Sequence, residues 1–408
     1  MKKTKKTKKT MLFTLALALV MLILVQGVSY ASSGGKPGQK QLGLQVNEGG
    51  ILIKDGKPYR GIGVNFFDAF IRALDDPNTT SYREGFQALG EYDIPFARFS
   101  VGGYWPIQWK MYKEDKERYF QILDDVVQSA EDNHVGLIPS FFWSFAAADL
   151  AGDPMNRWGI PSSNLHQFMK TYVREVVTRY KDSPAIWGWE FGNEYNLSSD
   201  LPNASDWRPP VIPELGTPTS RSAEDELTHS MIRTAFTEFA KEVRKYDPNR
   251  IIISGNSIPR ASEWHQEQYL SWEQDTEEQF AEMLNKDNPN PMNTISVHIY
   301  DKEETRFSRT VPVEELLNKL MKVSKKAKKP LFVGEFGAGE DQGHEAAQQS
   351  FERLITAIDE AKVPLAAVWV FDLSNQPTNT ITPTNNRSYQ LDRIQEINES
   401  PGSGHHGH

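Results

Sequence analysis

The chain has 408 residues, a formal net charge of −9 at pH 7 and no cysteine. The lack of cysteine excludes disulfide bonds, cysteine-based zinc sites, iron–sulfur clusters and a cysteine nucleophile. An acidic chain repels phosphate backbones, so we expect no nucleic-acid partner. Hydrophobic residues at 38% and aromatic residues at 11% are enough for a large core, which excludes a disordered chain.

The N-terminus has the pattern of an export signal. Six lysines lie within Met1–Thr10, an apolar run covers Met11–Val25, and Ser29-Tyr30-Ala31 forms a small-x-small cleavage site. We therefore predict a signal peptide over residues 1–31 and a secreted protein with no stable membrane association after cleavage. The lysine-rich start is typical of a Gram-positive bacterium. A retained membrane anchor is the alternative, although the run is short for a spanning helix.

After a polar linker at 32–41, we expect one domain over residues 42–400 and a disordered, histidine-containing tail at 401–408. Asp55-Gly56 is a favoured two-residue turn and predicts an N-terminal β-hairpin from residues 50–54 and 57–60. Eight later runs have the composition of strands that are buried on both faces. These runs are Arg60–Phe66, Phe96–Val101, Val135–Phe141, Ile186–Phe191, Ile251–Gly255, Ile295–Ile299, Leu331–Gly334 and Ala366–Phe371.

Between these runs, apolar residues recur at helical spacing. The pattern is clear in Lys116–Asn133, Ser163–Tyr180, Glu224–Tyr246, Val313–Ala327 and Glu345–Ala361, and weaker in Ser81–Leu89, Thr276–Leu284 and Tyr389–Ile397. The repeated alternation predicts an α/β fold, a (β/α)8 TIM barrel in a single domain. A doubly wound open sheet is the alternative. It usually carries a glycine-rich phosphate turn after its first strand, which Val64–Asp68 lacks.

Polar residues and long loops gather where the predicted strands end. Tyr195–Ala223 follows strand four and Leu373–Arg387 follows strand eight, on the face where barrel enzymes place their sites. Glu194 and Glu335 lie at the mouths of strands four and seven. Strand ends converge on one centre, so both carboxylates can reach one bond. Glycosidic cleavage needs such a pair, one to protonate the leaving oxygen and one to attack the anomeric carbon or activate water.

The motifs around these glutamates resemble those of the retaining glycoside hydrolases of clan A, and are nearest to family 5, the cellulase and endo-β-mannanase family. Asn193-Glu194, the His-x-Tyr of His298–Tyr300, the Gly-Glu-Phe-Gly of Gly334–Gly337 and Trp369 occur in this order along the barrel. The resemblance implies that Glu194 is the acid/base and that Glu335 is the nucleophile forming the glycosyl-enzyme.

The same resemblance implies supporting roles for five further residues. Asn193 would bind the sugar 2-hydroxyl, and Arg98 would lie beside the nucleophile and keep it ionised. His298 and Tyr300 match the His-x-Tyr of strand six, with Tyr300 donating toward the nucleophile and the ring oxygen. Trp369 would form the floor of the subsite that holds the reacting sugar.

Electrostatics supports the same division of labour. Glu335, beside a fixed guanidinium, should have a lowered pKa. Glu194, without an obvious neighbouring cation, should stay protonated near neutral pH. Glu190, four residues before Glu194 in the same strand, is interpreted as a buried structural partner.

The chain departs from the family pattern in two places. No histidine follows strand three between Val135 and Leu165, and Tyr195 stands where a proline commonly follows the Asn-Glu pair. We expect Trp143 or Phe142 to form the wall that the missing histidine would supply. The chain therefore looks like a divergent member, and the departures affect the substrate assignment more than the mechanism.

These residues favour a secreted, monomeric endo-β-1,4-mannanase that acts on polysaccharide or oligosaccharide without metal or cofactor. An endo-β-1,4-glucanase (cellulase) and an exo-acting β-mannosidase or β-galactosidase are the alternatives among hydrolases. An inactive carbohydrate-binding barrel would have lost a glutamate or Arg98. A metal-dependent hydrolase would need several ligands at strand ends, where His298 is the only histidine. The tail residues His405, His406 and His408 are interpreted as a solvated end rather than a metal-binding string.

Overall fold

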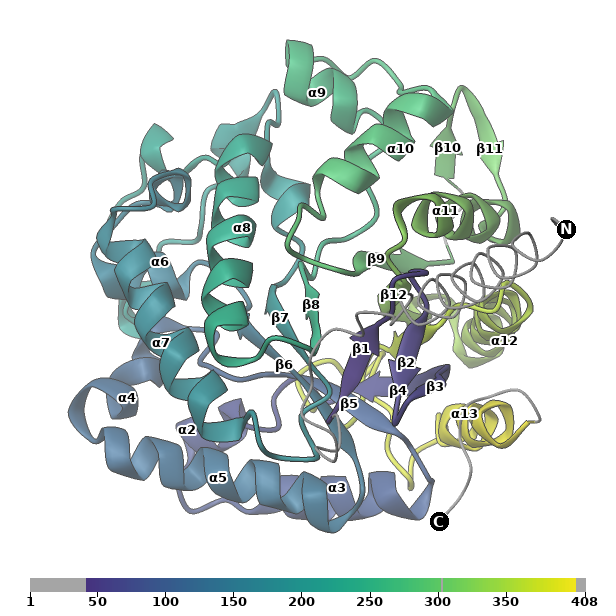
Figure 1. Ribbon diagram of the computed structural model, residues 1–408, viewed down its shortest axis with the longest axis horizontal. Coiled ribbons are helices and arrows are strands. Elements are labelled where there is room, and N and C mark those ends of the chain that lie inside the picture. The colour runs from purple at the N-terminus through teal and green to yellow at the C-terminus, as the bar shows by residue number, and fades with distance from the viewer. Residues whose placement is uncertain (1–41, 302–303, 401–408) are drawn as a thin grey trace, which may run out of the picture. The chain divides into compact units, whose positions relative to one another are not determined.

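The computed structural model describes residues 42–301 and 304–400. Its main sheet has eight parallel strands, hydrogen-bonded in the order β8-β7-β6-β5-β4-β13-β12-β9, which nearly closes into a barrel (Figure 1). The predicted (β/α)8 fold is confirmed. The strands are β4 (Gly61–Asn65), β5 (Phe96–Ser100), β6 (Gly136–Phe142), β7 (Gly188–Gly192), β8 (Ile251–Ile253), β9 (Ile295–Tyr300), β12 (Leu331–Gly337) and β13 (Leu365–Val368).

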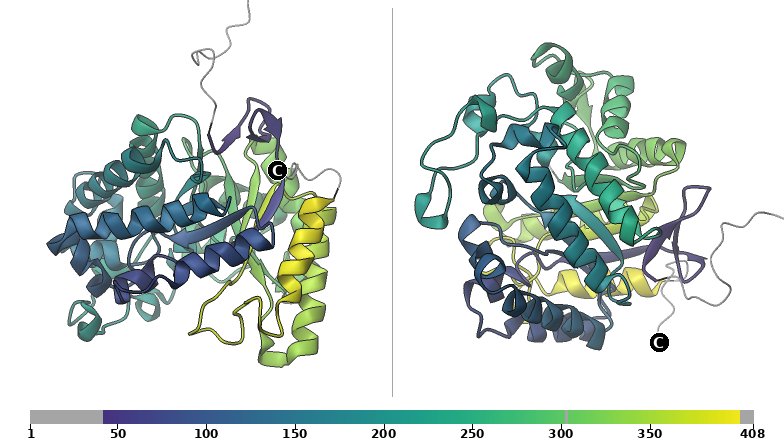
Figure 2. Two further views of the ribbon diagram at one scale, coloured as in Figure 1. Left: turned by 90° about the horizontal axis from the view of Figure 1, so that it is seen from below. Right: turned by 60° about the vertical axis from the view of Figure 1, so that its left-hand side comes forward.

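Helices surround these strands (Figure 2). All eight predicted helices are present, and most begin and end within two residues of the expected positions. They are α3 (Ser81–Glu91), α5 (Lys116–Asp132), α7 (Asn164–Tyr180), α8 (His229–Tyr246), α10 (Glu277–Lys286), α11 (Val313–Ala327), α12 (His344–Glu360) and α13 (Tyr389–Glu399). Their apolar stripes are buried against the barrel, as helical periodicity requires.

One helix boundary was predicted wrongly. The segment expected to be helical from Glu224 becomes α8 only at His229, where the Thr228 side chain caps the first turn. The residues before it form a separate 3-10 turn, Ala223–Asp225, capped by Ser222. The caps at Ser222 and Thr228 therefore start two separate helical segments, where apolar spacing alone predicts one continuous helix.

Several short elements were not predicted, and most of them follow strands at the carboxyl end of the barrel. Elements of three to seven residues are too short to show a helical or alternating period. They are α2 (Ile71–Asp75), α4 (Lys110–Glu114), α6 (Ala146–Ala151), α9 (Glu263–Tyr269) and the hairpin of β10 (Glu304–Arg306) and β11 (Arg309–Val311).

A small antiparallel sheet lies at the amino end of the barrel. It contains β1 (Leu44–Val46), β2 (Leu52–Lys54) and β3 (Lys57–Pro58). The predicted Asp55-Gly56 turn joins β2 and β3 with both residues at positive φ, 50° and 77°, as a two-residue hairpin turn requires. The strand β1 was not predicted.

Apolar side chains from this sheet and from the inward faces of the strands form a separate inner core. Its members include Leu44, Leu52, Tyr59, Phe96, Ile138, Trp187, Ile251, Ile253, Phe332, Leu365 and Ala367. A packed, apolar amino end leaves the carboxyl end of the barrel as the place for polar chemistry.

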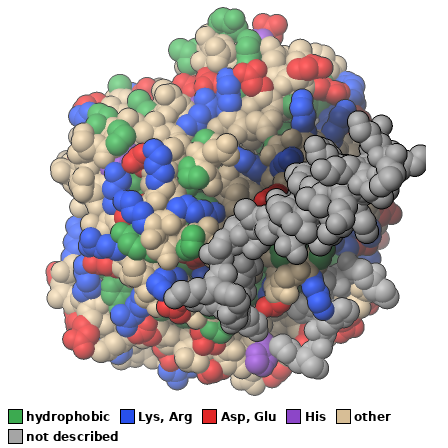
Figure 3. Space-filling view, viewed as in Figure 1, with side chains coloured by type: hydrophobic (Ala, Val, Ile, Leu, Met, Phe, Trp, Pro, Cys, Tyr) green, Lys and Arg blue, Asp and Glu red, His purple; other side chains and the backbone are tan. Residues whose placement is uncertain are grey.

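The predicted signal peptide (1–31), linker (32–41) and tail (401–408) lie outside the described residues. Within the described part of the chain, no helix has both the length and the hydropathy needed to cross a bilayer. On the face shown in Figure 3, acidic and basic side chains are interspersed rather than separated into patches of one sign.

Candidate active site

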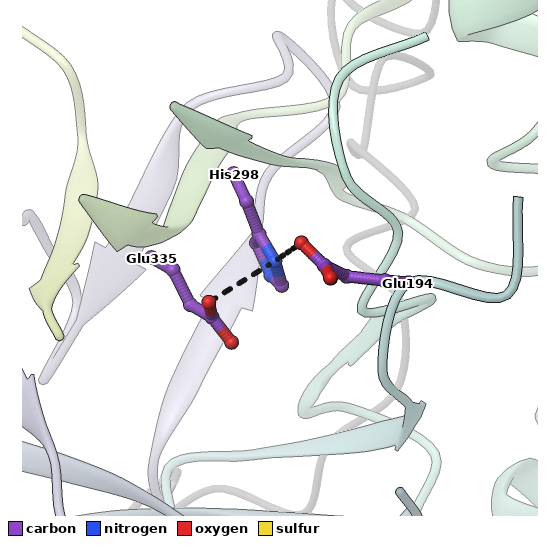
Figure 4. Close-up of side chains that lie close together, drawn as sticks. All are labelled: Glu194, His298 and Glu335. Carbon is purple, nitrogen blue, oxygen red and sulfur yellow. Dashed lines mark hydrogen bonds and ion pairs between the residues drawn. The ribbon is translucent and has the colours of Figure 1, made fainter. Parts of the chain in front are cut away.

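Glu194 and Glu335 come from strands β7 and β12 and meet at the carboxyl end of the barrel (Figure 4). Glu335 lies within β12, where the pairing with β9 shifts register. Glu194 is the second residue after β7 and has φ of 52°, a left-handed conformation that is uncommon for glutamate. Its N–H donates to the Gly255 carbonyl at 2.9 Å, and the 3-10 helix η3 (Tyr195–Ser198) begins next. The backbone turns sharply here and the carboxylate points toward Glu335.

The separation of the two carboxyl groups matches one stereochemical class. One oxygen of Glu194, one oxygen of Glu335 and a ring nitrogen of His298 all lie within 4.8 Å of one another. Retaining glycosidases place their carboxyl groups about 5–5.5 Å apart, and inverting enzymes about 6.5–9.5 Å apart, because a water must fit between them. A nearest approach within 4.8 Å is in keeping with the shorter, retaining spacing.

Arg98 organises the base of this site and is completely buried. Its Nη1 donates to Glu335 Oε1 at 2.9 Å and to Asn65 Oδ1 at 2.9 Å. Its Nε donates to Glu190 Oε1 at 2.8 Å, and its Nη2 donates to Asn193 Oδ1 at 2.8 Å. Glu190 is a buried structural partner, as predicted. Asn65 was not predicted, although a polar residue at the end of an otherwise apolar strand was the available signal.

Tyr300 holds the second oxygen of Glu335. Its hydroxyl donates to Glu335 Oε2 at 2.7 Å. Burial, followed by the charge of Glu335, raises the pKa of Tyr300 well above its usual range, so the hydroxyl remains a donor. With Arg98 on the other oxygen, the carboxylate is fixed by two donors from two different strands.

His298 contacts the other glutamate more closely. Its Nδ1 lies 2.8 Å from Glu194 Oε1 and 3.6 Å from Glu335 Oε2. The opposite side of the ring packs against Gly334, where a Cβ atom would come within 2.9 Å of Nε2. Gly334 therefore provides the space that the imidazole occupies.

The protonation expected for Glu194 is wrong for this state of the molecule. Burial raises the pKa of Glu194, but the hydrogen bond and charge of His298, together with the charge of Arg98, outweigh burial and hold the pKa below its usual range. The sequence suggested no cation beside Glu194 because His298 is 104 residues away and is brought in only by barrel closure.

Of the two aromatic residues expected to replace the missing histidine, Trp143 lies at the site. The Arg98 guanidinium lies over its ring, 4.3 Å from the centroid, in a cation–π contact. Phe142 instead packs into the outer core against Trp158 and Phe191, with ring centroids 5.7 and 5.6 Å away. The strand alternation that turns Phe142 outward turns Trp143 inward.

Trp369 lies beside Trp143, with ring centroids 6.1 Å apart. Its Nε1 donates to Gln376 Oε1 at 2.8 Å, so the long loop after β13 positions the indole. Phe67 also joins this aromatic wall, 4.6 Å from Trp143 and 6.0 Å from Trp369 between centroids. Phe67 was not predicted as a site residue.

Two hollows flank Glu194. One, of about 290 Å3, is lined by Trp143, Asn193 and Trp207, and the loop after β7 forms much of its wall. The other, of about 530 Å3, is lined by Ser257, His298 and Tyr300. Glu194 lines both.

Glu194, His298 and Glu335 also have the composition of a metal site. Both oxygens of Glu335, however, already accept hydrogen bonds, from Arg98 and from Tyr300. The buried guanidinium also disfavours a second positive charge close by. Neither oxygen of Glu335 is therefore without a hydrogen-bond donor in this cluster.

Comparison with protein families matches residues 94–375 to the model of Cellulase (glycosyl hydrolase family 5). Mannan endo-1,4-beta-mannosidase 7 of Arabidopsis thaliana is 26% identical over 226 residues, 49% of this chain and 46% of that protein. Probable mannan endo-1,4-beta-mannosidase A-1 of Aspergillus terreus is 36% identical over 95 residues, 21% of this chain and 24% of that protein. The chain thus spans less than half the length of these curated relatives.

Solved structures share the fold. The endo-1,4-beta-mannanase from Rhizomucor miehei superposes with a TM-score of 0.61 at 14% identity, covering 88% of this chain and all of that one. An exo-beta-1,4-mannosidase from Opitutaceae bacterium strain TAV5 gives a TM-score of 0.56 at 15% identity, covering 88% of this chain and 64% of that one. At these identities the likeness concerns the fold.

Proposed function

Because the chain belongs to glycosyl hydrolase family 5, whose model matches residues 94–375, we propose that it is a retaining endo-β-1,4-mannanase. The observation that carries the proposal is the spacing of Glu194 and Glu335, whose nearest carboxyl oxygens lie within 4.8 Å at the mouth of the barrel. The site residues Arg98, Asn193 and Tyr300 bind this pair or lie beside it.

In the first step, Glu335 attacks the anomeric carbon while Glu194 gives its proton to the glycosidic oxygen. The bond from the anomeric carbon to a Glu335 oxygen forms as the bond to the leaving sugar breaks. Arg98 and Tyr300 hold the Glu335 carboxylate in place before attack. Glu194 enters this step in its protonated form, against the hydrogen bond and charge of His298 and the charge of Arg98, which lower its pKa in the free enzyme.

In the second step, Glu194, now a carboxylate, removes a proton from water as the water oxygen attacks the anomeric carbon. The ester bond to Glu335 breaks and its carboxylate is restored, so the sugar keeps its β-configuration. Asn193 supports both steps. Its Oδ1 accepts from Arg98, so Nδ2 is the group that it presents to the sugar 2-hydroxyl. Trp369 and Trp143 supply the apolar wall on which the sugar ring packs.

Mannan is the proposed substrate because the relatives of Arabidopsis thaliana and Aspergillus terreus carry the name mannan endo-1,4-beta-mannosidase. Internal cleavage is favoured by the two separate hollows that Glu194 lines, since an internal site needs room for more than one sugar unit. We also propose that the chain is exported, on the strength of the leader-like residues 1–31, and that it acts as a monomer.

The test is digestion of mannan, glucomannan, carboxymethyl cellulose, lichenan and galactan, with products resolved by size. The proposal expects a ladder of oligosaccharides from mannan and glucomannan and little release from the other three. Monosaccharide alone would make the enzyme exo-acting. Faster release from carboxymethyl cellulose than from mannan would make it a cellulase.

A further inference from the structure

A second cluster of ionisable side chains is buried where two helices begin and a third one ends. His229 is the first residue of α8, Glu263 is the first residue of α9, and Asp287 caps the C-terminus of α10. All three are at most 1% exposed. One ligand atom from each lies within 4.8 Å of the others. None of these residues contributes to the hydrolase site described above.

The three atoms that face one another have no hydrogen-bond partner. They are His229 Nε2, Glu263 Oε1 and Asp287 Oδ2. Leaving a buried polar atom without a hydrogen-bond partner is costly, and more so for a charged group. Three such atoms pointing to a single place therefore require a shared partner.

The rest of each side chain is held by the surrounding protein. His229 Nδ1 lies 2.8 Å from Asp200 Oδ2. That oxygen also accepts the His229 backbone N–H at 2.7 Å. A carboxylate only accepts hydrogen bonds, so Nδ1 carries the proton and Nε2 is left to face the two other carboxylates. A carboxylate behind the imidazole is the usual support of a metal-binding histidine.

The two carboxylates are held in the same way. Glu263 Oε2 accepts the Arg260 backbone N–H at 2.9 Å and the Asn196 amide at 3.4 Å. Asp287 Oδ1 accepts from Arg233 Nη2 at 3.2 Å. In each residue one oxygen is fixed by donors and the other is directed at the common centre.

The one close distance in the cluster fits two ligands of a shared ion. His229 Nε2 and Glu263 Oε1 lie 3.4 Å apart and do not form a hydrogen bond. Ligands at about 2.0–2.2 Å from a tetrahedral ion lie roughly 3.3–3.6 Å from one another. Two carboxylates also balance the charge of a divalent cation, which burial demands.

We propose that His229 Nε2, Glu263 Oε1 and Asp287 Oδ2 bind a divalent transition-metal ion of the zinc class. An imidazole ligand favours such ions over calcium and magnesium, which prefer all-oxygen sites. The ion would be structural. It would tie α8, α9 and α10 together, and through Asn196 it would anchor the segment that follows Glu194.

The experiment uses the full chain carrying H405A, H406A and H408A, so that the tail histidines cannot bind metal. The protein is stripped with a chelator, titrated with Zn2+, and assayed for bound metal by mass spectrometry and for its Tm. We expect one Zn2+ per chain and a Tm that rises with Zn2+ concentration. Bound Co2+ should give visible d–d absorption.

Asp287→Asn is the decisive variant, because the new amide can donate to His229 Nε2 in place of the ion and keep the cluster folded. It should bind no Zn2+, show no Co2+ bands and have a Tm that is independent of Zn2+. Glu263→Gln provides a second variant with the same expectation. His265→Gln is the control, since His265 lies on α9 and pairs with Asp275 at 2.8 Å outside the cluster. It should keep one Zn2+, as should Glu335→Gln in the active site.

Three results would overturn the proposal. The stripped chain could take up neither Zn2+ nor Co2+, which would make the cluster a metal-free group of charges. Asp287→Asn and Glu263→Gln could bind as much Zn2+ as the parent. Calcium or magnesium could bind in preference to zinc, which would contradict the proposed class of ion. All three are independent of whether the chain hydrolyses mannan.

Discussion

Two clusters in this molecule each contain one histidine and two carboxylates, yet they are built for different chemistry. In the active site both oxygens of Glu335 accept hydrogen bonds, from Arg98 and Tyr300, and the Glu194 side chain remains 29% exposed. In the second cluster His229 Nε2 and one oxygen of each carboxylate have no partner and no access to solvent.

The two histidines also face the carboxylates of their own clusters through opposite ring nitrogens. His298 uses Nδ1 toward Glu194, whereas His229 uses Nδ1 toward its supporting carboxylate and leaves Nε2 for the centre. Residue types alone therefore do not define a site. Donors on both oxygens of Glu335 and solvent access at Glu194 suit the first cluster to proton transfer. In the second cluster, buried atoms without a hydrogen-bond partner suit an ion.

The largest effect should come from removing either active-site glutamate. Glu335→Ala removes the proposed nucleophile and Glu194→Ala removes the proposed proton donor. Each should lower kcat on mannan by roughly 10²–10⁴-fold or more, the range that general acid–base catalysis supplies. Reducing-sugar release measures the effect. A loss of less than about tenfold in both variants would place the chemistry elsewhere.

Arg98→Lys should have the next largest effect. A single ammonium cannot replace the bonds to Glu190, Asn193 and Glu335 together. We expect kcat to fall by roughly 10²-fold, and Tm to fall because breaking a buried ion pair costs about 3–5 kcal/mol. Arg250→Lys is the matched control, since Arg250 is a buried arginine paired with Asp247 at 2.7 Å. It should lower Tm and leave kcat near the parent value. Equal kcat losses in both variants would reduce Arg98 to a stability role.

Tyr300→Phe should have a smaller effect, because it removes one hydrogen bond to Glu335 and leaves Arg98 in place. One bond to a charged group contributes about 1.5–3 kcal/mol, which predicts a roughly 10- to 100-fold loss in kcat/KM. Tyr112→Phe removes a similar tyrosine–glutamate bond, to Glu175 at 2.6 Å, between outer helices. That control should keep full activity. An unchanged kcat/KM in Tyr300→Phe would show that Arg98 alone is enough to hold the Glu335 carboxylate.

The smallest effect should be a displaced pH profile. His298 lowers the pKa of Glu194 against the raising effect of burial. His298→Gln removes that charge, so the pKa of Glu194 should rise. Since Glu194 must be protonated to act as the acid, the basic limb of kcat/KM should move to higher pH. His265→Gln should leave the profile unchanged. A shift of the basic limb to lower pH in His298→Gln would contradict the assignment of that limb to Glu194.

The sequence was most informative where structure is local and repeated. Eight apolar strands and the long amphipathic helices follow directly from hydropathy, and Glu194 and Glu335 follow from their places at strand ends. The start of α8 was missed because Thr228 and Ser222 cap separate turns.

What the sequence could not supply is contact between distant segments. The lowered pKa of Glu194 depends on His298 and the fourfold anchoring of Arg98 depends on Asn65, both of which are brought in by barrel closure. The cluster of His229 and Asp287 was missed for the same reason. These residues lie at helix ends with no motif spacing, and only packing of the helices brings them together.

We propose that Glu335 forms a covalent bond to the sugar while Glu194 moves the proton. The variant Glu194→Ala separates these two roles. With an aryl β-mannobioside carrying a good leaving group, the first step needs little acid assistance. We predict a burst of one aryl group per enzyme, a sugar mass on the peptide containing Glu335, and β-glycosyl azide when azide is added. A sugar attached to another residue, or α-glycosyl azide as the product of this variant, would contradict the account.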